Sequence, residues 1–129
     1  MWFSVGSARQ NFNIAWKDEP WSQYDAYLSE MKHLTMQMHS RLAILVFPYE
    51  PQLEEYNLGH EPEYVMKPQR QINVLCRKYD VPCLDMFSAL AKNGADKLFR
   101  DGIHLSRQGH ELTASLIYAF LYEHHLLSH

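Results

Sequence analysis

Leu42-Ala43-Ile44-Leu45-Val46-Phe47 is the stretch that decides the fold, an apolar run that ends at Pro48. Its apolar residues are continuous rather than alternating, which is typical of a strand whose two faces are both covered by helices in a parallel sheet. Two shorter apolar segments, residues 2–5 and 81–85, are predicted to be strands as well. The sequence therefore predicts an α/β fold with about three strands.

Helical patterns lie between these strands. Apolar residues recur at three- and four-residue spacing from Tyr24 to Met38, which predicts an amphipathic helix over residues 22–38 with one face in the core. Pro68 is suited to the first turn of a second helix that continues to about residue 79. Residues 48–67 are predicted to be a loop, and a loop of this length in a small domain is often functional.

The last part of the chain predicts two more helical segments. Residues 86–92 should form one or two helical turns, which Asn93-Gly94 ends, and Ser106 is a suitable N-cap for a final helix to about residue 127. Strands that alternate with helices predict a parallel sheet with right-handed crossovers and helices on both faces. In such a sheet the reactive loops lie beyond the carboxyl ends of the strands.

Composition narrows the class of protein. The 129 residues suit one domain, and Lys+Arg 12 against Asp+Glu 15 leave a net charge of −3. This balance argues against nucleic acid as a partner, because phosphate neutralisation needs a basic face. No apolar run approaches the roughly 20 residues of a membrane-spanning helix. The first residues show no signal-peptide pattern, which leaves the location open but favours the cytoplasm. Cys76 and Cys83 are expected to be reduced, packed thiols.

The candidate chemistry lies in Asp101-Gly102-Ile103-His104, just before the final predicted helix. A carboxylate and an imidazole three positions apart on a turn can meet, so that one ring nitrogen keeps a proton and the other acts as a base on a hydroxyl nucleophile. Asp101 could instead be a turn-forming residue beside a histidine at a helix entry. A metal site of Asp101, His104 and His110 has suitable residue types. No further ligand at suitable spacing supports it, so neither a metal nor a cofactor is expected.

The whole run from Leu98 to His110 closely resembles the last sequence block of the SGNH, or GDSL-type, hydrolases. Leu45-Val46-Phe47-Pro48 and Leu84-Asp85-Met86-Phe87 resemble the corresponding parts of that family, so that the resemblance covers roughly residues 42–127. It implies a three-layer, flavodoxin-like α/β/α fold and an esterase or lipase-like activity on the ester or acyl bond of a small substrate. It further implies that Asp101 and His104 are the acid and base members of a Ser-His-Asp triad.

The nucleophile and the oxyanion hole of that family are not found in their usual form. The resemblance implies a Gly-Asp-Ser block, a further glycine and a Gly-x-Asn-Asp block. Ala8 stands where the asparagine of the last block belongs, with Asn11 and Asn13 nearby. Ser7 follows a predicted strand and Gly6, which makes it an alternative nucleophile in this chain.

The resemblance implies that residues 1–129 form a single domain equivalent to the C-terminal part of an SGNH hydrolase. The sheet is then incomplete, and its open apolar edge predicts self-association or a complementing chain. Tyr49 and Tyr56, together with Phe47, are candidate walls of a substrate pocket. We expect either an ester hydrolase to which this chain supplies His104 and Asp101, or a fragment that needs another chain for the nucleophile. The alternative is a degenerate, non-catalytic α/β module for binding or assembly.

Overall fold

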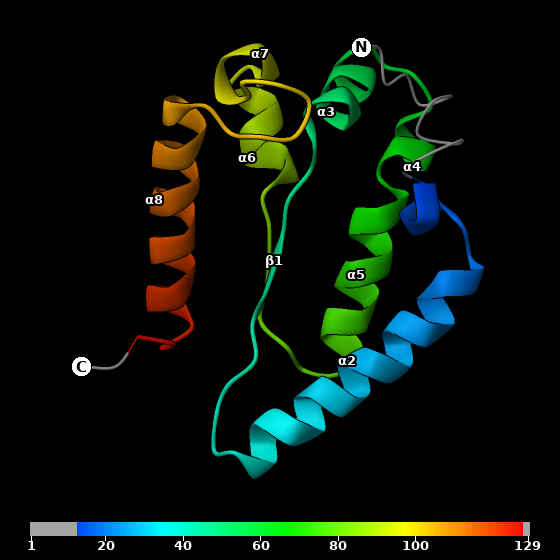
Figure 1. Cartoon of the computed structure of the whole chain (residues 1–129), viewed down its shortest axis with the longest axis vertical. Helices are drawn as coiled ribbons and strands as arrows, with labels where there is room; N and C mark the ends of the chain where they lie inside the picture. Colours follow the sequence, from blue (N-terminus) through cyan, green and yellow to red (C-terminus); the bar gives the residue numbers. More distant parts are fainter. Residues whose placement is uncertain (1–12, 128–129) are drawn as a thin grey trace.

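Two short strands pair in parallel at the centre of the computed structural model, which describes residues 13–127 (Figure 1). They are β1 (Ile44–Val46) and β2 (Cys83–Asp85), and their register places each residue of β1 opposite the corresponding residue of β2. Both lie inside the strands predicted at 42–47 and 81–85, so these two predictions are confirmed. The strand predicted at 2–5 lies outside the described residues. The described chain therefore has a mixed α/β fold with a two-stranded parallel sheet.

Helices make up most of the rest of the described chain. In chain order they are η1 (Asn13–Trp16), α2 (Glu19–Gln37), α3 (Glu50–Asn57), α4 (Pro62–Val65), α5 (Lys67–Lys78), α6 (Phe87–Lys92), α7 (Ala95–Leu98) and α8 (Arg107–Glu123). The connection from β1 to β2 runs through α3, α4 and α5, since parallel strands need a crossover of about a dozen residues or more. Of the helices between residues 13 and 127, none has both the length and the apolar character needed to cross a membrane.

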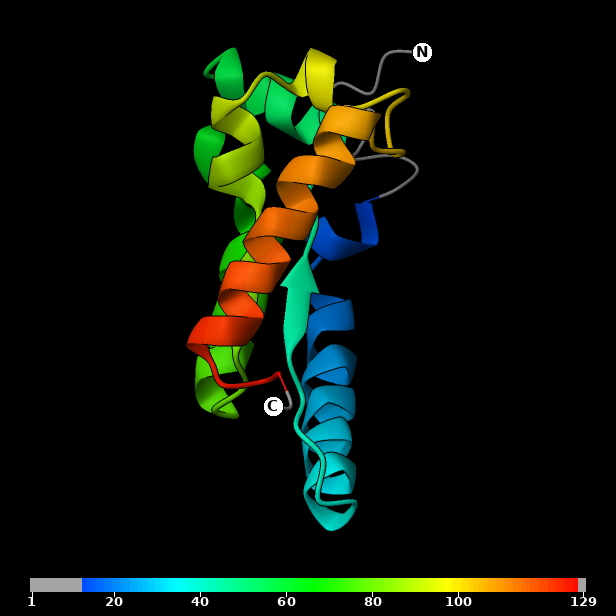
Figure 2. The same cartoon turned by 90° about the vertical axis from the view of Figure 1, so that its left-hand side faces the viewer.

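The helices lie on two sides of the strands. In Figure 1, α8 lies to one side of β1 and β2, and α5 and α2 lie to the other; Figure 2, viewed from the α8 side, shows the same arrangement. Successive residues of β2 contact the two sides in turn. The Cys83 thiol hydrogen bonds the thiol of Cys76 in α5, whereas Leu84 packs against the same core cluster as Leu116 of α8. Helices on both sides of the strand pair account for its continuous apolar residues, although Leu45 of β1 is 38% exposed.

Residues 48–67 contain the helices α3 and α4, so the prediction of a loop was wrong for these two segments. The helices α3 and α4 each carry a proline in the first turn, Pro51 and Pro62, where the missing N–H removes no intrahelical bond. They bury Leu53 and Val65 in the main core cluster, together with residues of α6 and α7. Burial of one such side chain contributes about 2 kcal/mol. Tertiary burial therefore orders a segment whose polar composition suggested a loop.

The apolar face of α2 also differs from its prediction. The helix is confirmed, but Leu28 is its buried residue. Five other apolar side chains form a stripe along one face and are 41–71% exposed, and we call them the α2 stripe: Tyr24, Tyr27, Met31, Leu34 and Met38. No element within residues 13–127 covers this face, so the predicted core contact is not made by the described chain.

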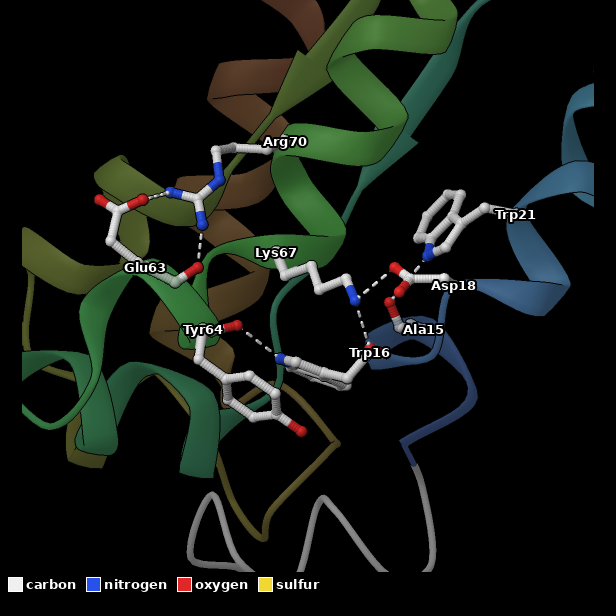
Figure 3. Close-up of polar contacts among 8 residues, drawn as sticks. All are labelled: Ala15, Trp16, Asp18, Trp21, Glu63, Tyr64, Lys67 and Arg70. Atoms are coloured by element: carbon white, nitrogen blue, oxygen red, sulfur yellow. Dashed lines mark hydrogen bonds and ion pairs between the residues drawn. The ribbon is translucent and has the colours of Figure 1, made fainter.

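The short helix η1 is held against α4 and α5 (Figure 3). Trp16 Nε1 donates a hydrogen bond to the Tyr64 carbonyl at 2.8 Å. Lys67 Nζ donates to the Trp16 carbonyl at 2.8 Å and pairs with the Asp18 carboxylate at 2.6 Å. These contacts fix the point at which the chain enters the described fold.

Both ends of α8 are capped. The Ser106 hydroxyl accepts a hydrogen bond from the Gly109 N–H at 3.1 Å, so the predicted N-cap is confirmed. At the other end, the Arg41 guanidinium donates to the carbonyls of His124 and His125 at 2.9 Å and 2.6 Å. Arg41 lies just before β1, and it therefore joins the start of that strand to the end of α8.

Candidate active site

Asp101 and His104 lie on a short loop between α7 and α8, which we call the site loop (residues 99–105). An isolated antiparallel bridge joins Phe99 to Leu105 at its base. Within the loop, the Arg100 N–H donates to the His104 carbonyl at 2.8 Å. The loop is therefore closed by its own backbone hydrogen bonds.

The site loop contacts the segment that follows β1. The Glu50 N–H, at the start of α3, donates to the Gly102 carbonyl at 3.1 Å. Because the chain leaves β1 at Val46 and reaches α3 at Glu50, this bond holds the loop at the carboxyl end of the strands. Ligand sites of parallel sheets lie at that end.

Asp101 holds the His104 ring in place. His104 Nδ1 lies 2.9 Å from both Oδ1 and Oδ2 of Asp101. The Oδ1 atom also accepts the backbone N–H groups of Ile103 and His104, at 3.1 Å and 2.9 Å. The loop turns back on itself over these residues, and the structure thus brings together the two side chains that the spacing predicted to meet.

The hydrogen bonds set the charge of this pair. The pKa of Asp101 is lowered to about 2 by hydrogen bonds, first from the backbone N–H of His104, then from the His104 ring and from the backbone N–H of Ile103. The carboxylate is therefore ionised at neutral pH. An ionised carboxylate only accepts hydrogen bonds, which assigns the proton of the neutral ring to Nδ1 and leaves Nε2 as an acceptor. The His104 and Asp101 side chains are 71% and 58% exposed. Nε2 is therefore accessible to a partner that approaches from outside.

Other carboxylates lie near the site loop. Burial raises the pKa of Glu50, and repulsion from Glu54, Asp101 and Asp96 raises it further. The start of α3 and the site loop therefore bring several carboxylates together.

The two candidate pocket tyrosines lie in different places. Tyr49 directly precedes Glu50, and its ring packs edge-on against Trp16 with 6.0 Å between centroids. Burial raises the pKa of Tyr49 to about 12. The Tyr56 ring packs against Phe87, with 5.0 Å between centroids. Tyr49 therefore adjoins the site loop through its chain neighbour, whereas Tyr56 contacts the core.

Several predicted site residues cannot be placed at the loop. Ser7, Ala8 and Asn11 lie outside the described residues, and Asn13 is the first residue of η1. His110 lies in the first turn of α8 and is exposed. Within the described range 13–127, no group of three His, Cys, Asp or Glu side chains could hold a metal ion.

Sequence reasoning missed two groups that position the site loop. One is the Glu50 N–H at the start of α3. Pro51 was the signal in the sequence for this helix start, because a proline often lies in the first turn of a helix. The other is Gly109, where an added Cβ would lie 2.2 Å from the Leu98 carbonyl oxygen. Only glycine therefore allows α8 to begin so close to α7.

Comparisons with protein-family models, with curated proteins and with solved structures find no match to this chain.

Proposed function

We propose that this chain is part of a serine-dependent hydrolase of ester or acyl bonds, of the SGNH type, and that it supplies the histidine base and its aspartate. The observation that carries this proposal is the contact of His104 Nδ1 with both carboxylate oxygens of Asp101, each at 2.9 Å. A general base needs this orientation, because Nε2 is then available to take a proton from a hydroxyl group. The resemblance of residues 98–110 to the last SGNH block supports the same assignment.

In the proposed reaction, a serine hydroxyl attacks the carbonyl carbon of a small ester. His104 Nε2 accepts the hydroxyl proton as the new C–O bond forms, and Asp101 stabilises the imidazolium. His104 then returns this proton to the alcohol that leaves. Water attacks the acyl-serine by the same route and releases the acid. Ser7 is the candidate nucleophile within this chain, and the alternative is a serine supplied by another chain.

The finer fold that we propose is a three-layer, flavodoxin-like α/β/α arrangement with an incomplete sheet. Three observations support it: β1 and β2 are parallel, helices lie on both sides of them (Figure 1), and the site loop contacts the segment beyond the carboxyl end of β1. Sites of such folds lie at this end of the sheet.

One observation favours a second candidate, a non-catalytic module for binding or assembly. Asp101 Oδ1 accepts two backbone N–H groups of the site loop, so this carboxylate has a turn-forming role that requires no catalysis. In addition, Ala8 stands where the SGNH resemblance implies a side-chain oxyanion donor. Loss of one such donor lowers kcat by about 10²–10³-fold in a comparable hydrolase.

Hydrolysis of p-nitrophenyl acetate by the purified chain distinguishes the two candidates. We expect turnover by the wild-type chain and by His110→Ala, which removes an exposed histidine outside the pair, and loss of turnover in His104→Ala. A wild-type rate no higher than that of His104→Ala would discard the enzymatic function for this chain by itself. Ser7→Ala then locates the nucleophile: a loss as large as that of His104→Ala assigns it to Ser7, and an unchanged rate excludes Ser7.

A further inference from the structure

The end of α2 carries exposed side chains of a different kind from those of the α2 stripe. His33, Met36 and His39 are all exposed, and Met36 is 62% exposed. Residues two positions apart on a helix do not share a face, so Met36 points away from Leu34 of the stripe. Methionine is ordinarily a core residue, and packing within the described chain does not account for an exposed methionine on this face.

His33 and Met36 lie one turn apart on one face of α2. Residues three positions apart on a helix have Cβ atoms about 5–6 Å apart. His33 Nε2 lies 3.0 Å from the side-chain nitrogen of Gln37, so the ring lies along the last turn of the helix. An amide nitrogen only donates, and this contact therefore leaves the lone pair on His33 Nε2. On an exposed surface this lone pair can exchange the amide for a metal ion.

The turn after α2 holds His39 at the end of the same helix. The His39 N–H donates to the Met36 carbonyl at 3.1 Å, and the Ser40 N–H donates to the Thr35 carbonyl at 2.8 Å. Such a pair of bonds commonly ends a helix at a left-handed residue, and His39 has a φ of 52°. Two imidazoles and a thioether thus follow one another at intervals of three positions, with the thioether in the middle.

The charges around the end of α2 suit a cation. The carboxyl end of a helix carries a partial negative charge, and the last turn of α2 has no basic residue. Lys32 donates to the Asp80 carbonyl at 2.9 Å, and Arg41 donates to the carbonyls of His124 and His125. The two cationic side chains that flank this turn in the sequence are therefore bonded to segments outside α2.

We propose that His33, Met36 and His39 bind a soft monovalent metal ion, of which Cu(I) is the biological example. Thioether ligands select Cu(I), and imidazole also suits copper, whereas Mg²⁺, Ca²⁺ and Mn²⁺ prefer oxygen ligands. Within residues 13–127, no group of three His, Cys, Asp or Glu side chains could hold a metal ion. The thioether of Met36 is therefore the ligand that distinguishes this site.

The proposed metal site lies far from the site loop. Figure 1 and Figure 2 both show the end of α2 at the lower tip of the molecule, whereas α7 and the start of α8, which flank the site loop, lie near the upper end. Metal binding at the end of α2 does not rest on the proposed ester hydrolysis, and its test needs no measurement of activity.

Titration of the full-length chain with Ag(I), a stable stand-in for Cu(I), tests the site. The thiols of Cys76 and Cys83 bind the same ions, so the titration uses the Cys76→Ala/Cys83→Ala variant with ¹³C-labelled methionine methyl groups. In chloride-free buffer, the Met36 methyl resonance should shift and reach its end point at one equivalent of Ag(I), while the Met31 resonance stays unchanged. If this variant does not fold, the wild-type chain gives the same comparison of Met36 with Met31 at higher Ag(I).

Two variants separate metal binding from structure. Met36→Leu keeps the size of the side chain and removes the thioether. His39→Gly removes an imidazole at a left-handed position where glycine is the common residue. We expect each to weaken the affinity for Ag(I) by about tenfold or more, with the Tm unchanged in Met36→Leu and unchanged or higher in His39→Gly. The control Met31→Leu removes a thioether of the α2 stripe and should leave the affinity unchanged.

Three results would overturn the metal site. The first is a Met36 resonance that shifts no more than that of Met31. The second is an equal loss of affinity in Met31→Leu and Met36→Leu, which would assign the ion to exposed thioethers in general. The third is binding of Zn²⁺ as tight as that of Ag(I), since a harder ion would not depend on the thioether. Absence of ester hydrolysis together with Ag(I) binding at Met36 would overturn the proposed function alone.

Discussion

The site loop and the α2 stripe differ in how far along the chain their partners lie. His104 finds its partner Asp101 three positions away, and the base of the loop is closed by Phe99 and Leu105. The five side chains of the α2 stripe are instead exposed, and no element of the described chain covers them. A polar pair can thus be assembled by local backbone geometry, whereas an apolar face depends on segments far away in the sequence.

The largest expected effect is confined to the site loop. His104→Ala should lower kcat for p-nitrophenyl acetate by about 10⁴-fold or more, and Asp101→Asn by about 10⁴-fold, because the base or its orientation is lost. Thermal unfolding should change little in either variant, since both side chains are more than half exposed. A loss of activity that only follows a loss of folded protein would show that the pair has a structural role alone.

A large effect on stability is expected where the site loop joins the core. Gly109→Ala places a Cβ 2.2 Å from the Leu98 carbonyl oxygen, and relief of this clash requires α8 to move away from α7. We expect the free energy of unfolding in urea to fall by about 3 kcal/mol. The control Gln108→Ala changes an exposed neighbour and should be nearly neutral. A neutral Gly109→Ala would mean that the start of α8 is less tightly held than the site loop suggests.

The N-cap of α8 should contribute less than Gly109. Ser106→Ala removes the acceptor of the Gly109 N–H and also the hydroxyl bond to the Lys97 carbonyl, which is 2.6 Å long. The expected cost is about 1 kcal/mol in the free energy of unfolding. Ser115→Ala, in the middle of the same helix and exposed, serves as the control. Equal costs for the two variants would refute the capping role.

The smallest expected effect is the acid dependence of stability that Asp101 contributes. Its pKa is lowered to about 2 in the folded chain from the ordinary value of 3.8, so the folded state binds the proton less readily than the unfolded state does. The stabilisation is therefore present above about pH 4 and is lost as the pH falls toward 2. Asp101→Asn should flatten the decline of Tm over this window, and Asp96→Asn should not. An identical pH profile of Asp101→Asn and the wild type would contradict the bonded carboxylate.

The parts of the molecule that the sequence predicted are those with a strong local cause. The strand around Ile44 and Val46 was visible in a continuous apolar run, and Ser106 was visible as a cap at the right distance before a helix. The approach of Asp101 to His104 was visible in their spacing. The helices within residues 48–67 were not predicted, because the burial of this segment depends on α6 and α7, which lie much later in the chain.

The sequence by itself determined the parallel strand pair, the main helices and the Asp101–His104 pair, because each depends on side-chain periodicity or on groups within one turn of each other. Only the tertiary structure decided that Glu50 anchors the site loop at the carboxyl end of the strands, and that Gly109 must lack a side chain. It also decided that the α2 stripe lacks a cover within residues 13–127. These features depend on which distant segments share the same space, and burial and close packing, not local spacing, settle that question.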